Sequence, residues 1–175
     1  ARHLRALDAL PGAGLLFATA LPMCSITGTD YGRIIRHHRS LLHKTAIAVL
    51  PGSLLGDWLD GYESVLLALA RGLGLRRGRR RRGTAAVVGY LMDRNEADHF
   101  GNLAELRRML AALGLETVSV WLGGEPVAAL KRAVEADLIV SLPYGRAAAR
   151  SLARATGAKL VETELPFGLP KTERF

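Results

Sequence analysis

The second half of the chain alternates between two kinds of apolar pattern. Short, nearly continuous apolar runs are separated by longer stretches in which leucine and alanine recur every three or four positions. The continuous runs predict buried strands, and the spaced pattern predicts helices with one apolar side. We expect strands at 84–91, 117–122, 137–142 and 159–162, and helices at 102–113, 126–136 and 145–156.

Residues at the expected helix ends agree with these limits. Asn102 followed by Glu105 predicts a capped helix start, and Gly114 and Gly157 are typical of helix ends. A strict alternation of strands and helices predicts a parallel sheet covered by helices on both faces. Because crossovers are right-handed, residues 84–175 are expected to form a Rossmann-like α/β domain.

The first half carries the same pattern over fewer elements. Residues 1–75 are therefore expected to form a partial α/β unit, one that needs more chain upstream or a partner to complete its sheet. The expected strands are 14–19 and 45–50, and the expected helices are 30–42 and 57–73. The chain does not begin with Met, and we expect it to be a fragment of a longer gene product.

Composition adds few constraints. The chain has 175 residues, of which 49% are hydrophobic and 23% charged, which is ordinary for a globular protein with a real core. No apolar run reaches the length that spans a bilayer, and no secretory signal is recognisable at the start. The single cysteine excludes an internal disulfide. A cytoplasmic location without membrane contact is the expectation.

Most of the net charge of +8 comes from one segment, 76–83, in which six of eight residues are arginine. This segment has no apolar periodicity and no aromatic residue, so we interpret it as a solvated linker between the two α/β units. The alternative is a basic patch for an acidic partner or nucleic acid, because arginine clusters bind phosphate non-specifically. Nucleic acid is the disfavoured partner.

In parallel sheets of this kind, ligands bind beyond the carboxyl ends of the strands. That rule selects five loops, all rich in glycine, proline or polar residues: 20–29, 51–57, 90–102, 143–145 and 165–171. Functional residues are commonly carried on such loops. No Gly-x-Gly-x-x-Gly follows any expected strand, which argues against a nicotinamide dehydrogenase.

Cys24 lies in the first of these loops. Thiolate is the soft ligand that iron–sulfur clusters use, and the following Thr29 or Asp30 predicts a helix start that would favour a thiolate. One cysteine cannot hold a cluster by itself, and a free cysteine is often a small buried hydrophobic residue. Both interpretations of Cys24 stay open on chemistry alone.

The loop after the strand at 84–91 is long and polar. Its acidic, basic and histidine side chains offer proton-transfer groups and anion contacts above the sheet, although charges in such a loop can also pair with one another in solvent. Tyr144, Gly145 and Arg146 begin another expected helix, whose free amides and guanidinium could hold an anion. His37, His38 and His43 lack the spacing of a metal site, and a solvated helix face is expected there.

The order and spacing of short motifs resemble the nitrogenase component 1-type oxidoreductases. That family includes nitrogenase subunits, light-independent protochlorophyllide reductases and cofactor-maturation scaffolds. The resemblance covers nearly the whole chain. The family's Cys-Pro loop has its proline after the cysteine, whereas Pro22 precedes Cys24 here. The matching residues are Cys24, Gly28, Asp30, Gly52, Gly56, Asp57, Asp98, Asn102, Glu105, Leu106, Trp121, Gly123, Pro166, Gly168 and Thr172.

The resemblance implies a subunit in reductive electron transfer. An ATP-dependent iron–sulfur reductase would deliver electrons, and an iron–sulfur cluster shared with a second component 1-type subunit or upstream residues would pass them on. Cys24 would be a ligand of that cluster. The substrate or cofactor cavity would be lined by Tyr90, Asp93, Arg94, Asn95, His99, Tyr144, Gly145, Arg146, Pro166 and Gly168. A scaffold that holds a metal-cofactor precursor without turnover, and a Rossmann-like binding domain using its arginines, remain the alternatives.

Overall fold

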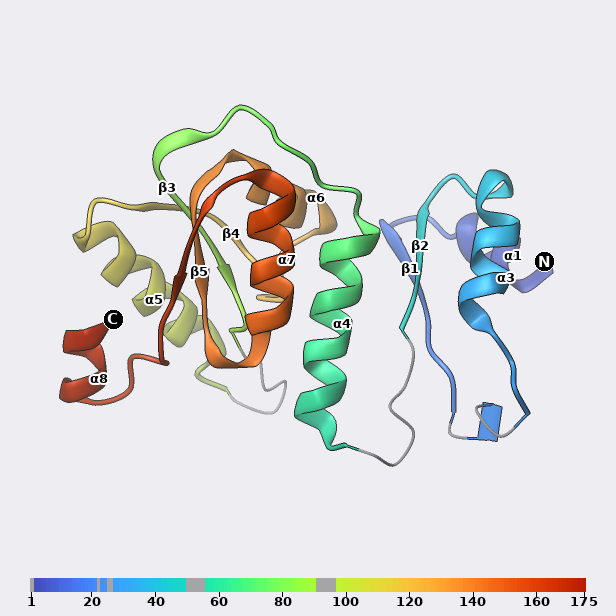
Figure 1. Cartoon of the computed structure of the whole chain (residues 1–175), viewed down its shortest axis with the longest axis horizontal. Helices are drawn as coiled ribbons and strands as arrows, with labels where there is room; N and C mark the ends of the chain where they lie inside the picture. The colour runs from blue at the N-terminus through green and yellow to red at the C-terminus, as the bar shows by residue number, and fades with distance from the viewer. Residues whose placement is uncertain (1, 22, 25–26, 50–55, 91–96) are drawn as a thin grey trace.

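The computed structural model describes residues 2–21, 23–24, 27–49, 56–90 and 97–175. Two parallel sheets lie on either side of helix α4, Trp58–Gly72 (Figure 1). The predicted α/β class, with parallel sheets and covering helices, is confirmed. No helix among the described residues is long and apolar enough to cross a membrane.

The smaller sheet pairs β1, Leu15–Ala18, with β2, Thr45–Ala48, in parallel. Between these strands the chain forms α3, Tyr31–His38, and the short η1, Arg39–Leu41. Asp30 is the N-cap of α3, and its carboxylate accepts a 2.8 Å hydrogen bond from the Arg33 amide. This confirms one of the two caps expected from the sequence. Before β1 lies α1, Arg2–Asp8, a helix that the sequence pattern did not predict.

Helix α4 packs against both sheets. Asp57 caps it, and Asp60 completes a capping box with the backbone of Asp57, which fixes where the helix begins. Leu66 and Leu69 have no exposed surface, and they share one hydrophobic cluster with Ile47 of β2. A Cβ atom at Gly72 would lie 2.7 Å from the Ile47 side chain, so glycine lets helix and strand approach closely.

The larger sheet has the strand order β4-β3-β5-β6, and all pairs are parallel. Its strands are β3, Arg81–Val88; β4, Glu116–Val120; β5, Ala136–Ser141; and β6, Lys159–Glu162. Its helices are α5, His99–Ala112; α6, Val127–Lys131, continued by η2, Arg132–Glu135; η3, Pro143–Gly145; α7, Arg146–Thr156; and α8, Leu169–Arg174.

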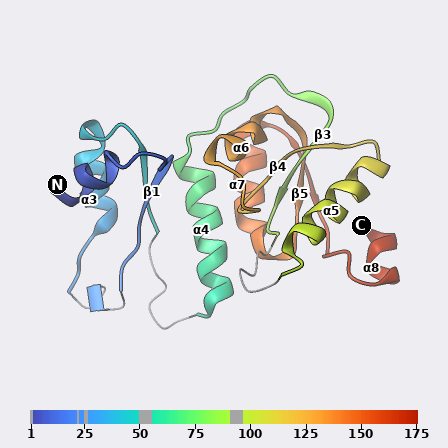
Figure 2. The same ribbon diagram turned by 180° about the vertical axis from the view of Figure 1, so that it is seen from behind.

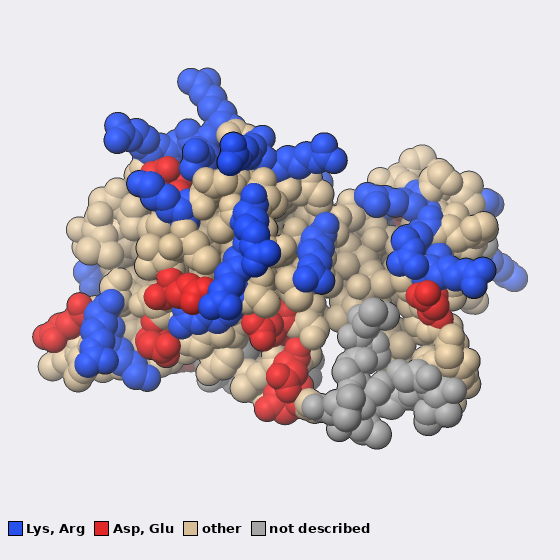
Figure 3. Space-filling model, in the orientation of Figure 1, with Lys and Arg blue, Asp and Glu red and all other residues tan. Residues whose placement is uncertain are grey.

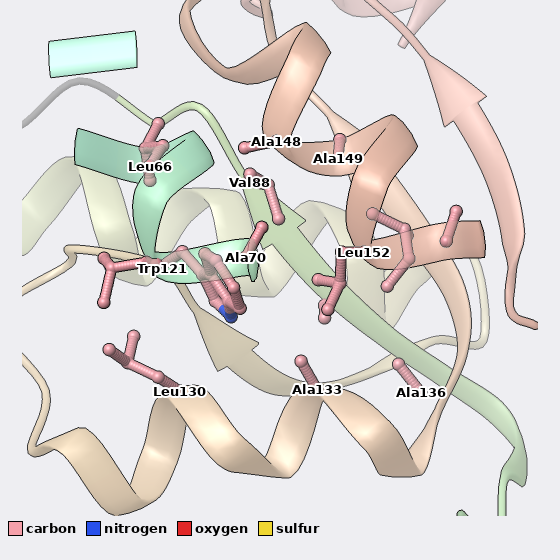
Figure 4. Close-up of a cluster of buried hydrophobic side chains, with 14 of the residues drawn as sticks. Leu66, Ala70, Val88, Trp121, Leu130, Ala133, Ala136, Ala148, Ala149 and Leu152 are labelled. Carbon is pink, nitrogen blue, oxygen red and sulfur yellow. The ribbon is translucent and has the colours of Figure 1, made fainter. Parts of the chain in front are cut away.

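Successive residues of β3 point to opposite faces and enter two different cores. Ala85 and Val87 pack with leucines of α5, whereas Ala86 and Val88 pack with α4, α6 and α7. Helix α5 therefore covers one face, and α4, α6 and α7 cover the other (Figure 2). The second core is built around Trp121, which is fully buried beside Leu130 of α6 and Ala70 of α4 (Figure 4).

Three local predictions are wrong. Helix α5 starts at His99, with Asp98 as the N-cap residue and no side-chain cap, so Asn102 lies inside the helix. The end of the expected linker, 76–83, belongs to β3, because this strand begins at Arg81 and not at the apolar run that starts with Thr84. The segment 165–171, expected to be a loop, enters helix α8 at Leu169. Pro170 favours the first turn of this helix because its φ is fixed near the helical value.

Candidate functional site

The order in which strands are added to the larger sheet changes direction between β3 and β5. From β3 the chain crosses to β4 on one side and then returns over β3 to β5 on the other. The connections that leave the carboxyl ends of β3 and β5 therefore diverge onto opposite faces. Ligands bind at such switch points in open α/β sheets. In Figure 1 these strand ends lie at the lower edge of the sheet.

A pocket of about 430 Å³ opens at this switch point. Tyr90 reaches it from the end of β3, and Leu142 and Tyr144 reach it from the end of β5. Helix α5, the chain after β6 and the start of α4 close the remaining sides. The full lining is Trp58, Tyr90, Asn102, Glu105, Leu106, Met109, Leu142, Tyr144, Leu165, Pro166 and Phe167. Its volume lies within the usual range for small-molecule sites.

The pocket wall is mostly aromatic and aliphatic, with two polar side chains from α5. Glu105 forms an ion pair of 2.7 Å with Arg108, and the hydrogen bond from Arg108 lowers the pKa of Glu105 below its ordinary value. Asn102 adds an amide, which can both donate and accept. An apolar wall with a few polar groups at one side is typical of sites that orient an organic ligand.

Tyr62 of α4 fixes the backbone at the pocket. Its hydroxyl donates to the carbonyl oxygen of Tyr90, and it is half-buried. Burial raises the pKa of Tyr62 well above its ordinary value, so the phenol stays protonated and remains a donor. The hydrogen bond ties helix α4 to the end of β3, where the switch point begins.

Tyr90 and His99 form a buried pair beside the pocket. The Tyr90 hydroxyl lies 3.2 Å from Nδ1 of His99, and the two ring centroids are 5.6 Å apart. His99 is only 7% exposed, and its Nε2 has no hydrogen-bond partner among the described residues. Tyr90 belongs to the pocket lining and His99 does not, so the imidazole lies behind Tyr90 and contacts its hydroxyl.

The structure brings together three residues of the predicted cavity, Tyr90, Tyr144 and Pro166. Gly145 is buried behind the wall against Gly89. Gly168 is exposed, with a φ of 74°, and is the N-cap residue of α8. Asp93, Arg94 and Asn95 lie outside the described residues.

Arg146 has a different environment from the one expected of an anion-binding group. Its guanidinium donates to the carbonyl oxygens of Ser141, at 3.2 Å, and Thr163, at 3.0 Å. It also forms ion pairs with Glu162, at 3.8 Å, and Glu164, at 3.2 Å. These contacts join the ends of β5 and β6, and the positive charge is already balanced by two carboxylates.

Sequence reasoning missed the face that α5 presents to the pocket. Asn102, Glu105, Leu106 and Met109 recur at helical spacing and all line the cavity. This spacing is a usable signal, because residues three, four and seven apart share one face of a helix. Trp58, at the start of α4, is 62% exposed and also lines the pocket.

Cys24 lies beyond the carboxyl end of β1, in the segment before α3. Its thiol is free and half-buried, and the Tyr31 hydroxyl donates a 3.3 Å hydrogen bond to its Sγ. This hydrogen bond is the main cause that raises the pKa of Tyr31. The Thr29 amide and the Thr27 hydroxyl both donate to the Cys24 carbonyl, at 3.0 and 3.1 Å. The sulfur is thus held in a defined position.

Cys24 fits one ligand position of a metal site. Within the described part of the chain, no three His, Cys, Asp or Glu side chains gather in a way that could hold a metal ion. A cluster bound through Cys24 therefore needs ligands from outside the described residues.

The sequence pattern of the family described as nitrogenase component 1 type oxidoreductase matches residues 2–175. A solved structure described as nitrogenase Cp1 at pH 6.5 is similar in fold, with a TM-score of 0.78 and 15% sequence identity. The similarity covers 99% of this chain and 42% of that chain, so the protein spans less than half of this relative's length. A comparison with curated proteins finds no match. The chain belongs to the nitrogenase component 1-type oxidoreductase family.

Proposed function

We propose that this chain is part of a subunit that takes part in reductive electron transfer, with Cys24 as one ligand of an iron–sulfur cluster shared across an interface. The observation that carries the proposal is the position of the Cys24 thiol, half-buried at a strand end and held by Tyr31. A thiolate that stays accessible on one side can complete a cluster whose other ligands come from elsewhere.

Tyr31 is a positioning residue in this proposal. Its hydroxyl donates toward Sγ, and hydrogen bonds to ligand sulfurs are one means by which proteins set the reduction potential of a cluster. When bound, the cluster supplies one-electron transfer, and the chain's own contribution is to hold the thiol and to partly shield it. Loss of the Tyr31 hydroxyl should therefore change the reduction potential of the cluster but leave Cys24 able to bind it.

The pocket at the switch point would border the substrate or cofactor cavity. Tyr90, Tyr144 and Phe167 contribute aromatic rings to a mostly apolar wall, which suits an organic molecule with a flat ring system. Asn102 offers the polar contact that fixes a direction of binding. Neither the pocket nor Cys24 identifies the substrate.

The partners of the proposed function are a second component 1-type subunit, which would share the cluster, and an ATP-dependent iron–sulfur reductase, which would supply electrons. A cluster with one described ligand supports the need for the first partner. A scaffold that holds a cofactor precursor without turnover would use the same thiol and the same pocket, and the experiment below separates it from an electron-transfer subunit.

The test is to purify the full gene product without oxygen, together with its second subunit, and to measure iron, sulfide and the electronic spectrum. We expect the wild-type complex to contain a reducible cluster and Cys24→Ala to lose it. Ser40→Ala is the control, since Ser40 is exposed in the same unit. Tyr31→Phe should retain iron and change the midpoint potential.

Equal iron and sulfide in the wild type and in Cys24→Ala would contradict the role of Cys24. A Cys24-dependent cluster that a reductase and ATP cannot reduce would contradict electron transfer and favour the scaffold. Retention of iron with an unchanged potential in Tyr31→Phe would remove Tyr31 from the proposal and leave Cys24 in place.

A further inference from the structure

Exposed cations gather at the edge of the larger sheet opposite to the pocket. Four different parts of the chain contribute: the segment that leads into the start of β3, the end of α6 with the start of η2, the end of α7 and the start of β6. Figure 3 shows Lys and Arg side chains clustered along the top of the molecule, over the amino ends of these strands. The contributing exposed residues are Arg76, Arg77, Arg79, Arg80, Arg81, Arg82, Lys131, Arg132, Arg154 and Lys159.

Some of these charges are already used within the fold. Arg81 pairs with Glu116 at 2.9 Å and with Glu135 at 3.7 Å, and Arg132 also pairs with Glu135. Arg80 donates to the Gly157 carbonyl at 2.7 Å. Arg77 lies against Gly157, where a Cβ atom built on that residue would be 2.8 Å from the Arg77 Nε. The remaining six cations form no ion pair within the described part of the chain. We call these six the basic edge: Arg76, Arg79, Arg82, Lys131, Arg154 and Lys159.

Helix ends account for part of this arrangement. Lys131 and Arg154 lie in the last turns of α6 and α7, where cations interact favourably with the helix dipole. Arg76 and Arg79 belong to no helix or strand, and Arg82 lies exposed in β3. No ion pair among the described residues involves these three arginines, so their positive charges stay available to a partner.

We propose that the basic edge docks an acidic face of a partner protein. Arginine is enriched in protein interfaces, and complementary charge steers association and fixes register. Leu113 lies on the same side, where the Gly114 carbonyl comes within 3.4 Å of a Cβ built at Gly83. Leu113 is 61% exposed and gives such an interface an apolar contact.

The arrangement of charges argues for a protein over nucleic acid. Glu116, Glu135 and Asp137 lie among the cations at the starts of β4 and β5, where they would repel a continuous row of phosphates. The arginine-rich segment 76–83 contains no aromatic residue on which a base could stack. Mixed charges with an apolar neighbour match a folded protein surface better.

The basic edge is remote from the candidate site. Strand β3 runs eight residues from Arg81 to Val88, which corresponds to roughly 25 Å between the two edges of the sheet. A protein bound to the basic edge would therefore leave the pocket and Cys24 accessible.

The test uses the full gene product with two probes, poly-L-glutamate and a 25-base-pair DNA duplex, with affinity measured at 50 and 150 mM NaCl. We expect poly-L-glutamate to bind more tightly than the DNA duplex at 150 mM NaCl. Replacement of Arg76, Arg79 and Arg82 by Gln should weaken its binding by about tenfold. The variant Lys131→Gln with Lys159→Gln should also weaken it. The matched control replaces Arg33, Arg39 and Lys171, which are exposed elsewhere.

Tighter binding of the duplex at 150 mM, lost in the same variants, would overturn the proposal in favour of a polyphosphate surface. Equal affinity of wild type, edge variants and control for poly-L-glutamate would also overturn it. Iron content is measured in parallel, and since the basic edge is remote from Cys24, the edge variants should retain it. Failure of this proposal is thereby distinguished from failure of the proposed electron-transfer function.

Discussion

Gly89 and Gly145 are packed backbone to backbone at the switch point of the larger sheet. A Cβ atom at Gly89 would lie 2.5 Å from the Gly145 amide nitrogen, and one at Gly145 would lie 2.7 Å from the Gly89 Cα. Gly89 also has a φ of 92°, which L residues with side chains rarely adopt. The chains leaving β3 and β5 can approach this closely before they diverge only because both residues are glycine.

Gly89→Ala should destabilise the protein by about 3 kcal/mol, since overpacking adds to an unfavourable φ. The free energy of unfolding in urea is the measurement. Gly61→Ala is the matched control: Gly61 lies inside α4, with open space around an added Cβ, and alanine should stabilise the helix by about 0.5–1 kcal/mol. Equal stability of the wild type and Gly89→Ala would show that the backbone crossing can relax.

The strands and helices of the larger sheet were largely predictable, because each apolar run is bounded by a glycine or a polar cap. β6 was predicted over 159–162, as observed, and Gly157 ends α7 with a φ of 75°. The start of α5 was predicted wrongly because Asn102 has the spacing of a cap. The helix begins one turn earlier, at His99. There the His99 side chain contacts Tyr90, and the spacing of residues along the sequence gives no signal for this contact.

The candidate site was predictable to the level of loops. The strand-end rule selected the segments of Tyr90, Tyr144 and Pro166, which do line one pocket. It could not show that Trp58 at the start of α4 would reach the same pocket, because that depends on how α4 packs beside α7. Nor could it show that Arg146 turns toward Glu162 and Glu164.

Arg146→Gln should lower stability by about 2 kcal/mol, because it leaves two strand-end carbonyls without their donor. Thermal or urea unfolding measures this loss. The control is Arg150→Gln. Arg150 is more exposed than Arg146, and its ion pair with Glu162 should contribute at most about 1 kcal/mol to the free energy of unfolding. If Arg146→Gln unfolded like the wild type yet lost binding of an anionic ligand, Arg146 would have the binding role expected from the sequence.

Asp8 joins α1 to the chain before β2. Its carboxylate accepts hydrogen bonds from the amides of His43, at 3.0 Å, and Lys44, at 2.8 Å, and these bonds lower the pKa of Asp8. A carboxyl whose pKa is lower in the folded state stabilises the protein above its unfolded pKa of about 3.9. That contribution is lost as pH falls through the folded pKa.

Asp8→Asn should therefore reduce the urea midpoint at pH 7 and have a smaller effect near pH 3, because the contribution of the charged carboxyl decreases below its unfolded pKa. Unfolding curves of both proteins at the two pH values measure the difference. Asp30→Asn is a useful comparison, since that exposed cap accepts one amide hydrogen bond, from Arg33 at 2.8 Å, and has only a long, exposed ion pair of 3.8 Å with Arg36. A pH-independent difference between Asp8→Asn and the wild type would contradict the role of the charge.

The packing of α4 predicts that both sheets unfold together. Leu69 is fully buried in the cluster that joins Ile47 of β2 to Leu152 of α7. Leu69→Ala should cost about 3 kcal/mol, because truncation leaves a cavity in this shared core. We expect Cys24 labelling by a thiol reagent and Trp121 fluorescence, recorded in a Trp58→Phe background, to report one transition that shifts equally.

Leu113→Ala provides the control for Leu69→Ala, since Leu113 is 61% exposed and its truncation should leave the transition nearly unchanged. A shift seen by Trp121 fluorescence but not by Cys24 labelling would mean that the smaller sheet unfolds by itself. In that case the chain before α4 would form an independent unit, and Ile47 would contribute little to the shared core. A common shift would instead make α4 the element that holds Cys24 in a fixed relation to the pocket.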